Sequence, residues 1–411
     1  MKRIIIISLF MLLSIAAYCQ SVATSPYSIY GLGSLYQSDF GPISAMGGTG
    51  IALPSSTFIN NKNPSSLAFI GKNSFFYDFG AKTIFSTYKD KSKTEKKKNT
   101  QFSHIAFAFP VNSKSGISIA LLPYSSASYV ISNYRMKINN SNEYYYLDAE
   151  SKGGLNSFDV AYGYQLSKKL ALGIKPSVYF GSIEENKNFS IANSITTINT
   201  TSNYKGVRFT LGSQFCVDST FVLGLTVKTP AKISAGKKQS IKSVNGTDTE
   251  IVAAEIVSDA VNYYLPLEIG FGVNKRFKNN MSFSVDYEKS LWNSTNQSSI
   301  YGQFTNQDKL SVGFSYFKDQ LRKTNFYEKI HYYLGMNYDS GFLLINDQKV
   351  DNIAFSVGFG IPLEHTNSQF NISYSYGIKA KVSNDLIKEN YHKIGINFSF
   401  EAIWFMKGKY E

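Results

Sequence analysis

Charged side chains recur on the polar faces of segments in which apolar and polar residues alternate. The seven that stand out are Lys175, Arg208, Glu268, Asp286, Glu288, Lys379 and Lys393. Such charges cannot face lipid without a large cost, so they indicate the interior side of a membrane-embedded wall. Two kinds of chemistry are open to them. Arg208 or Lys175 could attract the carboxylate headgroup of a ligand, or the charges could form an internal network of ion pairs.

Groups that catalyse reactions form no recognisable arrangement in this chain. The four histidines are His104, His331, His365 and His392, and no Ser or Asp pattern beside them marks a nucleophile. The HExxH, GxSxG and P-loop motifs are also missing from the sequence. We therefore expect no enzymatic activity, no catalytic residue, no cofactor and no metal site.

The elements that must position these charges have the period of β-strands. In residues 392–400, HKIGINFSF, His392, Ile394 and Ile396 fall on one face, while Lys393 and Gly395 fall on the other. Side chains alternate between the two faces along a strand, so one face is apolar and the other is polar. The chain contains fourteen such segments, at roughly 74–88, 101–110, 116–132, 154–166, 169–183, 204–217, 220–229, 263–276, 280–290, 308–318, 329–339, 351–363, 368–380 and 390–403.

The connections between these segments alternate between long and short. The long ones include 89–100, 133–153, 184–203, 230–262 and 291–307, and the short ones include 111–115, 167–168 and 218–219. One exception, at about 319–328, is longer than a tight turn. Short periplasmic turns and long outer loops are typical of outer-membrane barrels. We therefore predict an all-β fold, a 14-stranded antiparallel transmembrane β-barrel in a Gram-negative outer membrane.

The first residues predict export. Lys2 and Arg3 precede an apolar run that ends at Ala17, and residues 17–19 resemble a cleavage site, so we predict a signal peptide over 1–19. Acylation of Cys19, as in a lipoprotein, is the alternative interpretation. Without the signal, Cys216 is a lone cysteine and makes no internal disulfide.

The formal net charge is +13, with lysine clusters at 89–98 and 237–242. These clusters fall between predicted strands, where they indicate either solvated loops or contacts with anionic outer-membrane lipid and lipopolysaccharide. An exported barrel has no reason to meet nucleic acid, so we expect none as a partner.

Residues 46–69 come before the first strand and lack any strand period. A barrel of fourteen strands encloses more space than its own side chains fill. We therefore predict that residues 20–73 form an N-terminal plug, or hatch, inside the lumen of a barrel formed by residues 74–411.

The plug segment resembles a known family. Gly47, Gly48 and Gly50, followed by Asn63, Pro64 and Ser65, are similar to the plug motifs of the FadL family, although Ser65 stands where Ala is usual. The whole sequence resembles FadL-like proteins of Bacteroidetes. The resemblance implies a passive outer-membrane channel for long-chain fatty acids or other hydrophobic molecules.

A second resemblance concerns Pro123 and Tyr124 in the third predicted strand. Proline cannot donate to a strand ladder, so Pro123 predicts a local break. In the FadL family, an inward kink of this strand opens the wall and implies lateral exit of the ligand into the membrane.

Four apolar residues of the predicted plug, Phe58, Ile59, Leu67 and Phe69, could line a ligand pocket or simply pack the plug against the wall. The leading hypothesis is uptake of a fatty-acid-like hydrophobic molecule. The alternative is a barrel without transport activity that binds a protein partner, as a platform for secretion or surface assembly.

Overall fold

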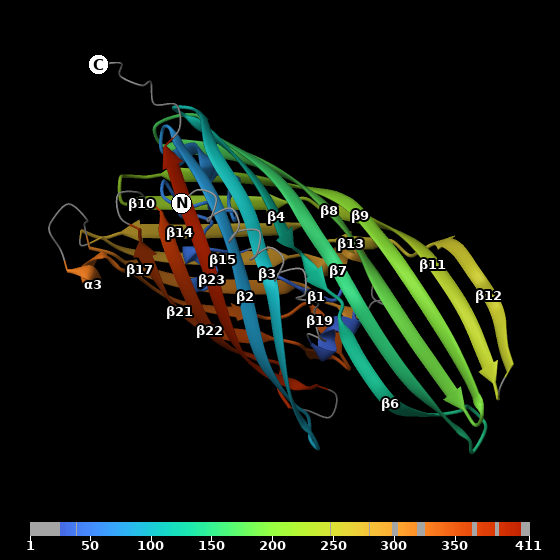
Figure 1. Cartoon of the computed structure of the whole chain (residues 1–411). Helices are drawn as coiled ribbons and strands as arrows, with labels where there is room; N and C mark the ends of the chain where they lie inside the picture. The colour runs from blue at the N-terminus through green and yellow to red at the C-terminus, as the bar shows by residue number, and fades with distance from the viewer. Residues whose placement is uncertain are drawn as a thin grey trace, which may run out of the picture.

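The computed structural model describes residues 25–37, 39–246, 248–278, 280–297, 303–318, 325–363, 368–382 and 386–403. The predicted signal peptide at 1–19 lies outside these residues. Fourteen antiparallel strands form a closed barrel, as the sequence predicted. In order around the wall they are β2 (Ser74–Lys89), β3 (Thr94–Asn112), β4 (Ser115–Pro123), β7 (Tyr144–Gln165), β8 (Leu170–Ile191), β9 (Ser194–Cys216), β10 (Phe221–Lys228), β14 (Glu268–Arg276), β15 (Met281–Ser290), β17 (Gln307–Tyr316), β18 (His331–Asp339), β21 (Asn352–Pro362), β22 (Gln369–Lys379) and β23 (Lys388–Ile403). The last strand pairs with the first, from Ser74 opposite Ile403 to Lys89 opposite Lys388 (Figure 1).

The alternation of side chains gives the wall two different surfaces. On β14, Ile269 and Phe271 point outward and are 42% and 48% exposed, while Gly270 and Gly272 between them are buried on the inner side. An apolar outer surface on fully paired strands suits hydrocarbon, where unpaired backbone groups cost several kcal/mol each. No helix in the described part of the chain is long and apolar enough to cross a membrane.

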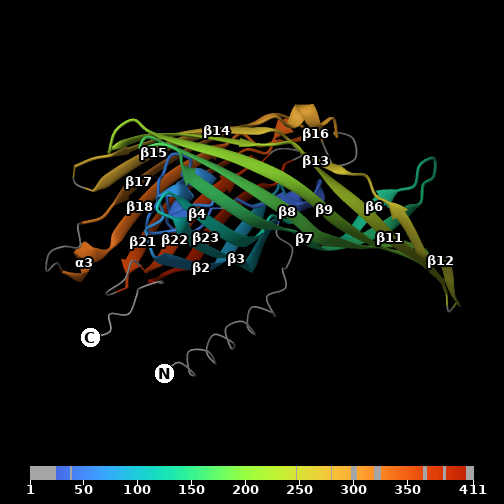
Figure 2. The same cartoon turned by 90° about the horizontal axis from the view of Figure 1, so that it is seen from above.

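Residues 25–37 and 39–73, which we call the inner segment, lie within the ring of strands (Figure 2). Their short elements are η1 (Pro26–Ile29), β1 (Ser34–Leu35), α2 (Pro42–Ala45) and η2 (Pro64–Phe69). Asn63 and Pro64 set the start of the helix η2. Asn63 caps it by accepting a hydrogen bond from the Ser65 N–H, and Pro64 occupies the first turn, where its missing N–H costs nothing.

One side of the wall continues far beyond the apolar band. β7, β8 and β9 are 22, 22 and 23 residues long, about twice the ~9–11 residues that cross a bilayer. They are joined there by β6 (Tyr129–Lys137), β11 (Ala231–Asn245), β12 (Asp248–Asp259) and β13 (Tyr263–Leu265). We call this extension the outer sheet; Figures 1 and 2 show it projecting from one end of the barrel.

The outer sheet shows that the prediction of long loops was wrong for three of the connections. Residues 133–153, 184–203 and 230–262 consist largely of strands instead of loops. Beyond Phe180 and Val207, which close the apolar band, the outward side chains become polar, as at Glu184 and Lys205. A strand with water on both faces has no reason to alternate apolar and polar residues, so its period is invisible in the sequence.

The predicted strand 116–132 is divided into three parts. β4 ends at Pro123, β5 (Ser125–Ser126) turns away to pair with β1, and β6 pairs only with β7 among the described residues. β3 pairs with β4 only from Ile105 onward. Above that level, within the described residues, no strand pairing joins β3 to β6, and we call this stretch of wall the seam.

The remaining elements lie at the two ends of the barrel wall or in its connections. They are η3 (Trp292–Thr295), β16 (Gln303–Phe304), α3 (Phe326–Lys329), β19 (Leu343–Ile345) and β20 (Gln348–Lys349), of which β16, β19 and β20 form a small sheet.

The inner segment approaches the wall closely at glycines. A Cβ on Gly335 of β18 would lie 2.0 Å from the Gly47 nitrogen, and Gly47 itself has a φ of +66° that side chains rarely adopt. On β9, a Cβ on Gly212 would lie 2.0 Å from the Asn63 Oδ1 atom. Glycine at these wall positions therefore permits a close approach of the inner segment, by its backbone at Gly335 and by the Asn63 side chain at Gly212, that a side chain on the wall would prevent.

We expect Gly335→Ala to lower the free energy of unfolding by about 2 kcal/mol, because the new methyl group overlaps the backbone of the inner segment. Urea titration in phospholipid vesicles measures this. Gly236→Ala on β11 is the matched control, since nothing lies within 4 Å of its added Cβ. Equal losses in the two variants would contradict close packing at Gly335.

Candidate functional site

Residues 46–69 of the inner segment are held by hydrogen bonds to their own backbone and to the wall. The Asp286 carboxylate on β15 accepts hydrogen bonds from the N–H groups of Gly50 and Ile51, at 2.7 and 3.0 Å. The Asn60 amide donates to the carbonyls of Gly50 and Leu53, at 2.7 and 2.8 Å. These side chains pair backbone groups that have no partner in a helix or sheet.

Asn63 joins the inner segment to β9. Its amide nitrogen donates to the carbonyl of Ile51 at 2.7 Å and to that of Ser213 at 3.0 Å. Ser65 is fully buried, and its hydroxyl donates to the Asn63 Oδ1 atom at 2.8 Å. The hydroxyl of this serine thus has a partner within the motif itself.

A chain of ion pairs runs from the inner segment across four strands, β15, β10, β14 and β9. Lys62 lies 2.7 Å from Glu288, Glu288 lies 4.0 Å from Lys228, and Lys228 lies 2.8 Å from Glu268. Glu268 also lies 2.8 Å from Arg208, which is 2% exposed. Arg208 and Glu268 are therefore already paired with each other inside the barrel.

Lys175 is paired in the same way. Its ammonium donates to the backbone carbonyl of Asn61 at 2.7 Å and lies 3.5 Å from the carboxylate of Asp159. This lysine therefore connects β8 to the inner segment. Its partners, like those of Arg208, belong to the protein.

The four apolar residues predicted for a ligand pocket do not line the cavity that lies between residues 25–44 and the wall. Ile59 and Leu67 are buried in an apolar cluster with Phe40 and Phe76, between the inner segment and the wall. Phe58 and Phe69 are half-buried. Their assignment to a ligand pocket remains a prediction.

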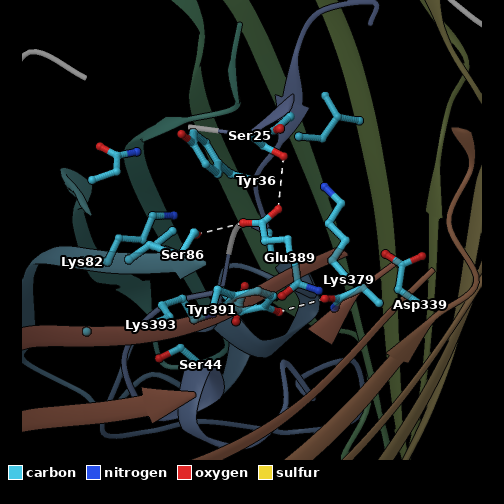
Figure 3. Close-up of a pocket in the computed structure, with 18 of the residues that line it drawn as sticks. Ser25, Tyr36, Ser44, Lys82, Ser86, Asp339, Lys379, Glu389, Tyr391 and Lys393 are labelled. Atoms are coloured by element: carbon cyan, nitrogen blue, oxygen red, sulfur yellow. Dashed lines mark hydrogen bonds between the residues drawn. The ribbon is translucent and has the colours of Figure 1, made fainter. Parts of the chain in front are cut away.

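A cavity of about 300 Å³ lies between residues 25–44 of the inner segment and the inner faces of β2, β3, β22 and β23 (Figure 3). Five lysines and three acids line it: Lys82, Lys97, Lys309, Lys379, Lys393, Asp39, Asp339 and Glu389. Apolar side chains from the inner segment and from the β18–β21 connection complete the lining.

Asp339 and Glu389, two of the three acids of the cavity, have partners of their own. Asp339 lies 3.9 Å from Lys309 and accepts a hydrogen bond from Gln307 at 2.7 Å. Glu389 accepts hydrogen bonds from the hydroxyls of Ser25 and Ser86, at 3.1 and 2.9 Å. Neither acid lies within ion-pair distance of the remaining lysines.

Two of the lysines lie against aromatic rings. The Lys82 ammonium lies 4.4 Å from the centre of the Tyr36 ring, and that of Lys379 lies 5.1 Å from the centre of the Tyr27 ring. The ring faces are weakly attractive for cations. Within the described part of the chain, no carboxylate lies within 4.0 Å of Lys82, Lys379 or Lys393.

His104 fixes the inner segment to the wall beside this cavity. Its Nε2 atom lies 2.7 Å from the Asp78 carboxylate, and its ring stacks on Phe40 with the centroids 3.8 Å apart. Asn397 on β23 donates to the same carboxylate. His104 and Asp78 are each 1% exposed, which indicates a structural contact instead of a solvent-facing one.

Sequence reasoning missed Lys82 and Tyr36. Lys82 falls on the inward face of the first predicted strand, two residues after Gly80, so the alternation of that strand contained the signal. Tyr36 lies in an irregular stretch, where no periodicity assigns a direction to a side chain. Among the described residues, no group of three His, Cys, Asp or Glu could hold a metal ion.

Because Asp286 binds both Lys62 and the backbone of the inner segment, its removal should lower the free energy of unfolding. Burial alone would lower the pKa of the Lys62 ammonium, but the carboxylates of Glu288 and Asp286 outweigh burial and raise it above its ordinary value. Asp286→Ala removes one of these charges and the acceptor of two backbone N–H groups, so we expect the free energy of unfolding to fall by about 3 kcal/mol.

The control is Asp308→Ala, which breaks an ion pair whose side chains are 41% and 46% exposed and should cost less than about 1 kcal/mol. Urea titration in vesicles compares the two variants. A similar decrease in the free energy of unfolding of both variants would mean that Asp286 does not hold the inner segment.

The fold has solved relatives of low sequence identity. The Pseudomonas putida toluene transporter TodX matches with a TM-score of 0.64 and 14% identity, over 91% of this chain and 99% of that one. A Pseudomonas aeruginosa FadL homologue matches with a TM-score of 0.61 and 12% identity, over 93% and 98%. The Ralstonia pickettii toluene transporter TbuX matches with a TM-score of 0.56 and 13% identity, over 88% and 98%.

These similarities show that the chain shares the fold of these solved proteins. No curated protein matches the chain in sequence. The sequence model of one family, described as BamG, matches residues 1–411. The chain therefore belongs to the BamG family.

Proposed function

We propose that the protein is an outer-membrane channel for passive uptake of hydrophobic molecules, such as long-chain fatty acids. The observation that carries the proposal is the cavity of about 300 Å³ between the inner segment and the wall, a size at the lower end of small-molecule sites. The fold of solved hydrophobic-compound channels supports it. Residues 1–19 would direct export, and the gradient or downstream consumption of the cargo would drive flux.

Lateral exit through the seam is the second part of the proposal. Asn99 and Ser103 of β3 line the cavity, so the cavity reaches the unpaired edge of β3. The Tyr36 hydroxyl lies beside Asn99 and Gln101 on β3 and beside Ser126 on β5. Cargo that displaced Tyr36 would meet the membrane where β4 ends at Pro123.

A second candidate function rests on the outer sheet. Strand β12 pairs only with β11 among the described residues, and Val252, Ile256 and Val257 are 58%, 44% and 70% exposed on it. Apolar residues on an unpaired edge favour association with another chain. This feature supports the alternative of a platform that binds a protein partner or outer-membrane lipid.

Native mass spectrometry of protein purified without added fatty acid separates the two functions. The uptake channel predicts a bound apolar compound, recoverable by lipid extraction, on a barrel without a partner protein. A barrel without such a compound that carries a stoichiometric protein partner would contradict uptake and favour the platform.

Tyr36→Ala tests the exit route. Removing the ring leaves the space between β3 and β5 unfilled, so we expect several-fold faster transfer of a fluorescent fatty acid from the protein into vesicle bilayers. Tyr30→Ala, which lines the same cavity, is the control. Unchanged transfer in Tyr36→Ala would contradict exit through the seam.

A further inference from the structure

Lys82 and Lys393 are neighbours on the inner wall although 311 positions separate them in the sequence. In the β2–β23 pair, Lys82 lies opposite Gly395 and Lys393 lies opposite Ile84, so the two lysines are diagonal neighbours. Diagonal positions on one face are about 7 Å apart, within reach of two long side chains. Figure 3 shows both lysines on the same side of the cavity.

The positive charge of this pair has no close counterion in the described part of the chain. Lys309 and Asp339 compensate each other, and Lys97 lies 3.1 Å from Glu95. Asp39 lines the cavity but lies beyond 4.0 Å from both ammonium groups. Two like charges on one enclosed surface raise each other's energy, and a bound anion would relieve both.

The cavity also has an apolar part. Leu35 and Phe40 of the inner segment and Phe342, Leu343 and Val350 of the β18–β21 connection contribute to its lining. A ligand with one charged end and one apolar end would match both parts. A neutral hydrocarbon would fill the apolar part and leave the lysines uncompensated.

We propose that Lys82 and Lys393 form an anion-binding site, and that the cargo of this channel is an amphiphile whose carboxylate or phosphate headgroup binds there. The inference rests on the proposed uptake function and specifies its cargo. It assigns the headgroup to a different pair of residues from Lys175 and Arg208, whose charges are already used in contacts within the protein.

The experiment compares four probes on protein in lipid nanodiscs: laurate, dodecyl phosphate, dodecanol and inorganic phosphate. Each charge-assisted hydrogen bond adds affinity, so we expect at least one of the two anionic amphiphiles to bind about tenfold or more tightly than dodecanol. The anion that shows the preference identifies the headgroup class. Inorganic phosphate should compete weakly, because it lacks the apolar end.

The variant Lys82→Gln/Lys393→Gln should lose the preference for the anion and keep its affinity for dodecanol. Lys82→Arg/Lys393→Arg should retain the preference, because the charges remain. Lys238→Gln, which removes a lysine of the outer sheet whose ion pair with Glu255 is exposed, should bind as the wild type does. Heat-modifiable migration in gels checks that each variant is folded.

The remaining outcomes separate the two proposals. Equal binding of laurate, dodecyl phosphate and dodecanol, or a preference that persists in the glutamine variant, would overturn the anion site and leave the uptake channel intact. Competition by inorganic phosphate as strong as that by dodecyl phosphate would overturn the amphiphilic cargo. Failure of all three dodecyl compounds to bind would overturn the uptake function itself.

Discussion

Every backbone N–H and C=O group that faces hydrocarbon needs a hydrogen-bond partner within the protein, and this requirement dictates a closed ring of strands. Fourteen strands satisfy it, with β23 returning to pair along the whole length of β2. The ring encloses an interior that its own side chains do not fill. The inner segment occupies this space, and its irregular backbone then needs partners too. Asp286, Asn60 and Asn63 supply them.

The interior contains paired charges beside its apolar clusters. Lys62, Glu288, Lys228 and Glu268 alternate in sign, so each charge lies beside an opposite one. Removing one member would leave a neighbouring charge without its counterion in a poorly hydrated space. The loss of one partner from a buried ion pair is strongly destabilising for this reason. Lys82, Lys379 and Lys393 in the cavity differ, because no carboxylate of the described residues lies within 4.0 Å of them, and the first two lie against aromatic rings. This contrast separates the part of the interior that holds the fold from the part available to a ligand.

Sequence patterns predicted the wall well, because lipid on one side and a polar interior on the other force an alternation that is visible in residues 392–400. They failed for 184–203, where water on both faces of the outer sheet removes the alternation. The partners of Lys175, Arg208 and Glu268 depend on register and closure, which no local pattern contains. The same limit applies to Lys82 and Lys393, since they meet only where the first strand pairs with the last.

The contact between the first and last strands also orders the events of folding in time. The inner segment touches β18 and β21 through α2 and β7, β8 and β9 through η2, so it lies against opposite parts of the ring. The pairing that completes the ring joins segments from the two ends of the chain. Pairings of such high sequence separation form slowly, since a long loop must be ordered before they contribute. During that interval β2 and β23 are free edges, and the nascent barrel depends on whatever protects or guides those edges until they meet.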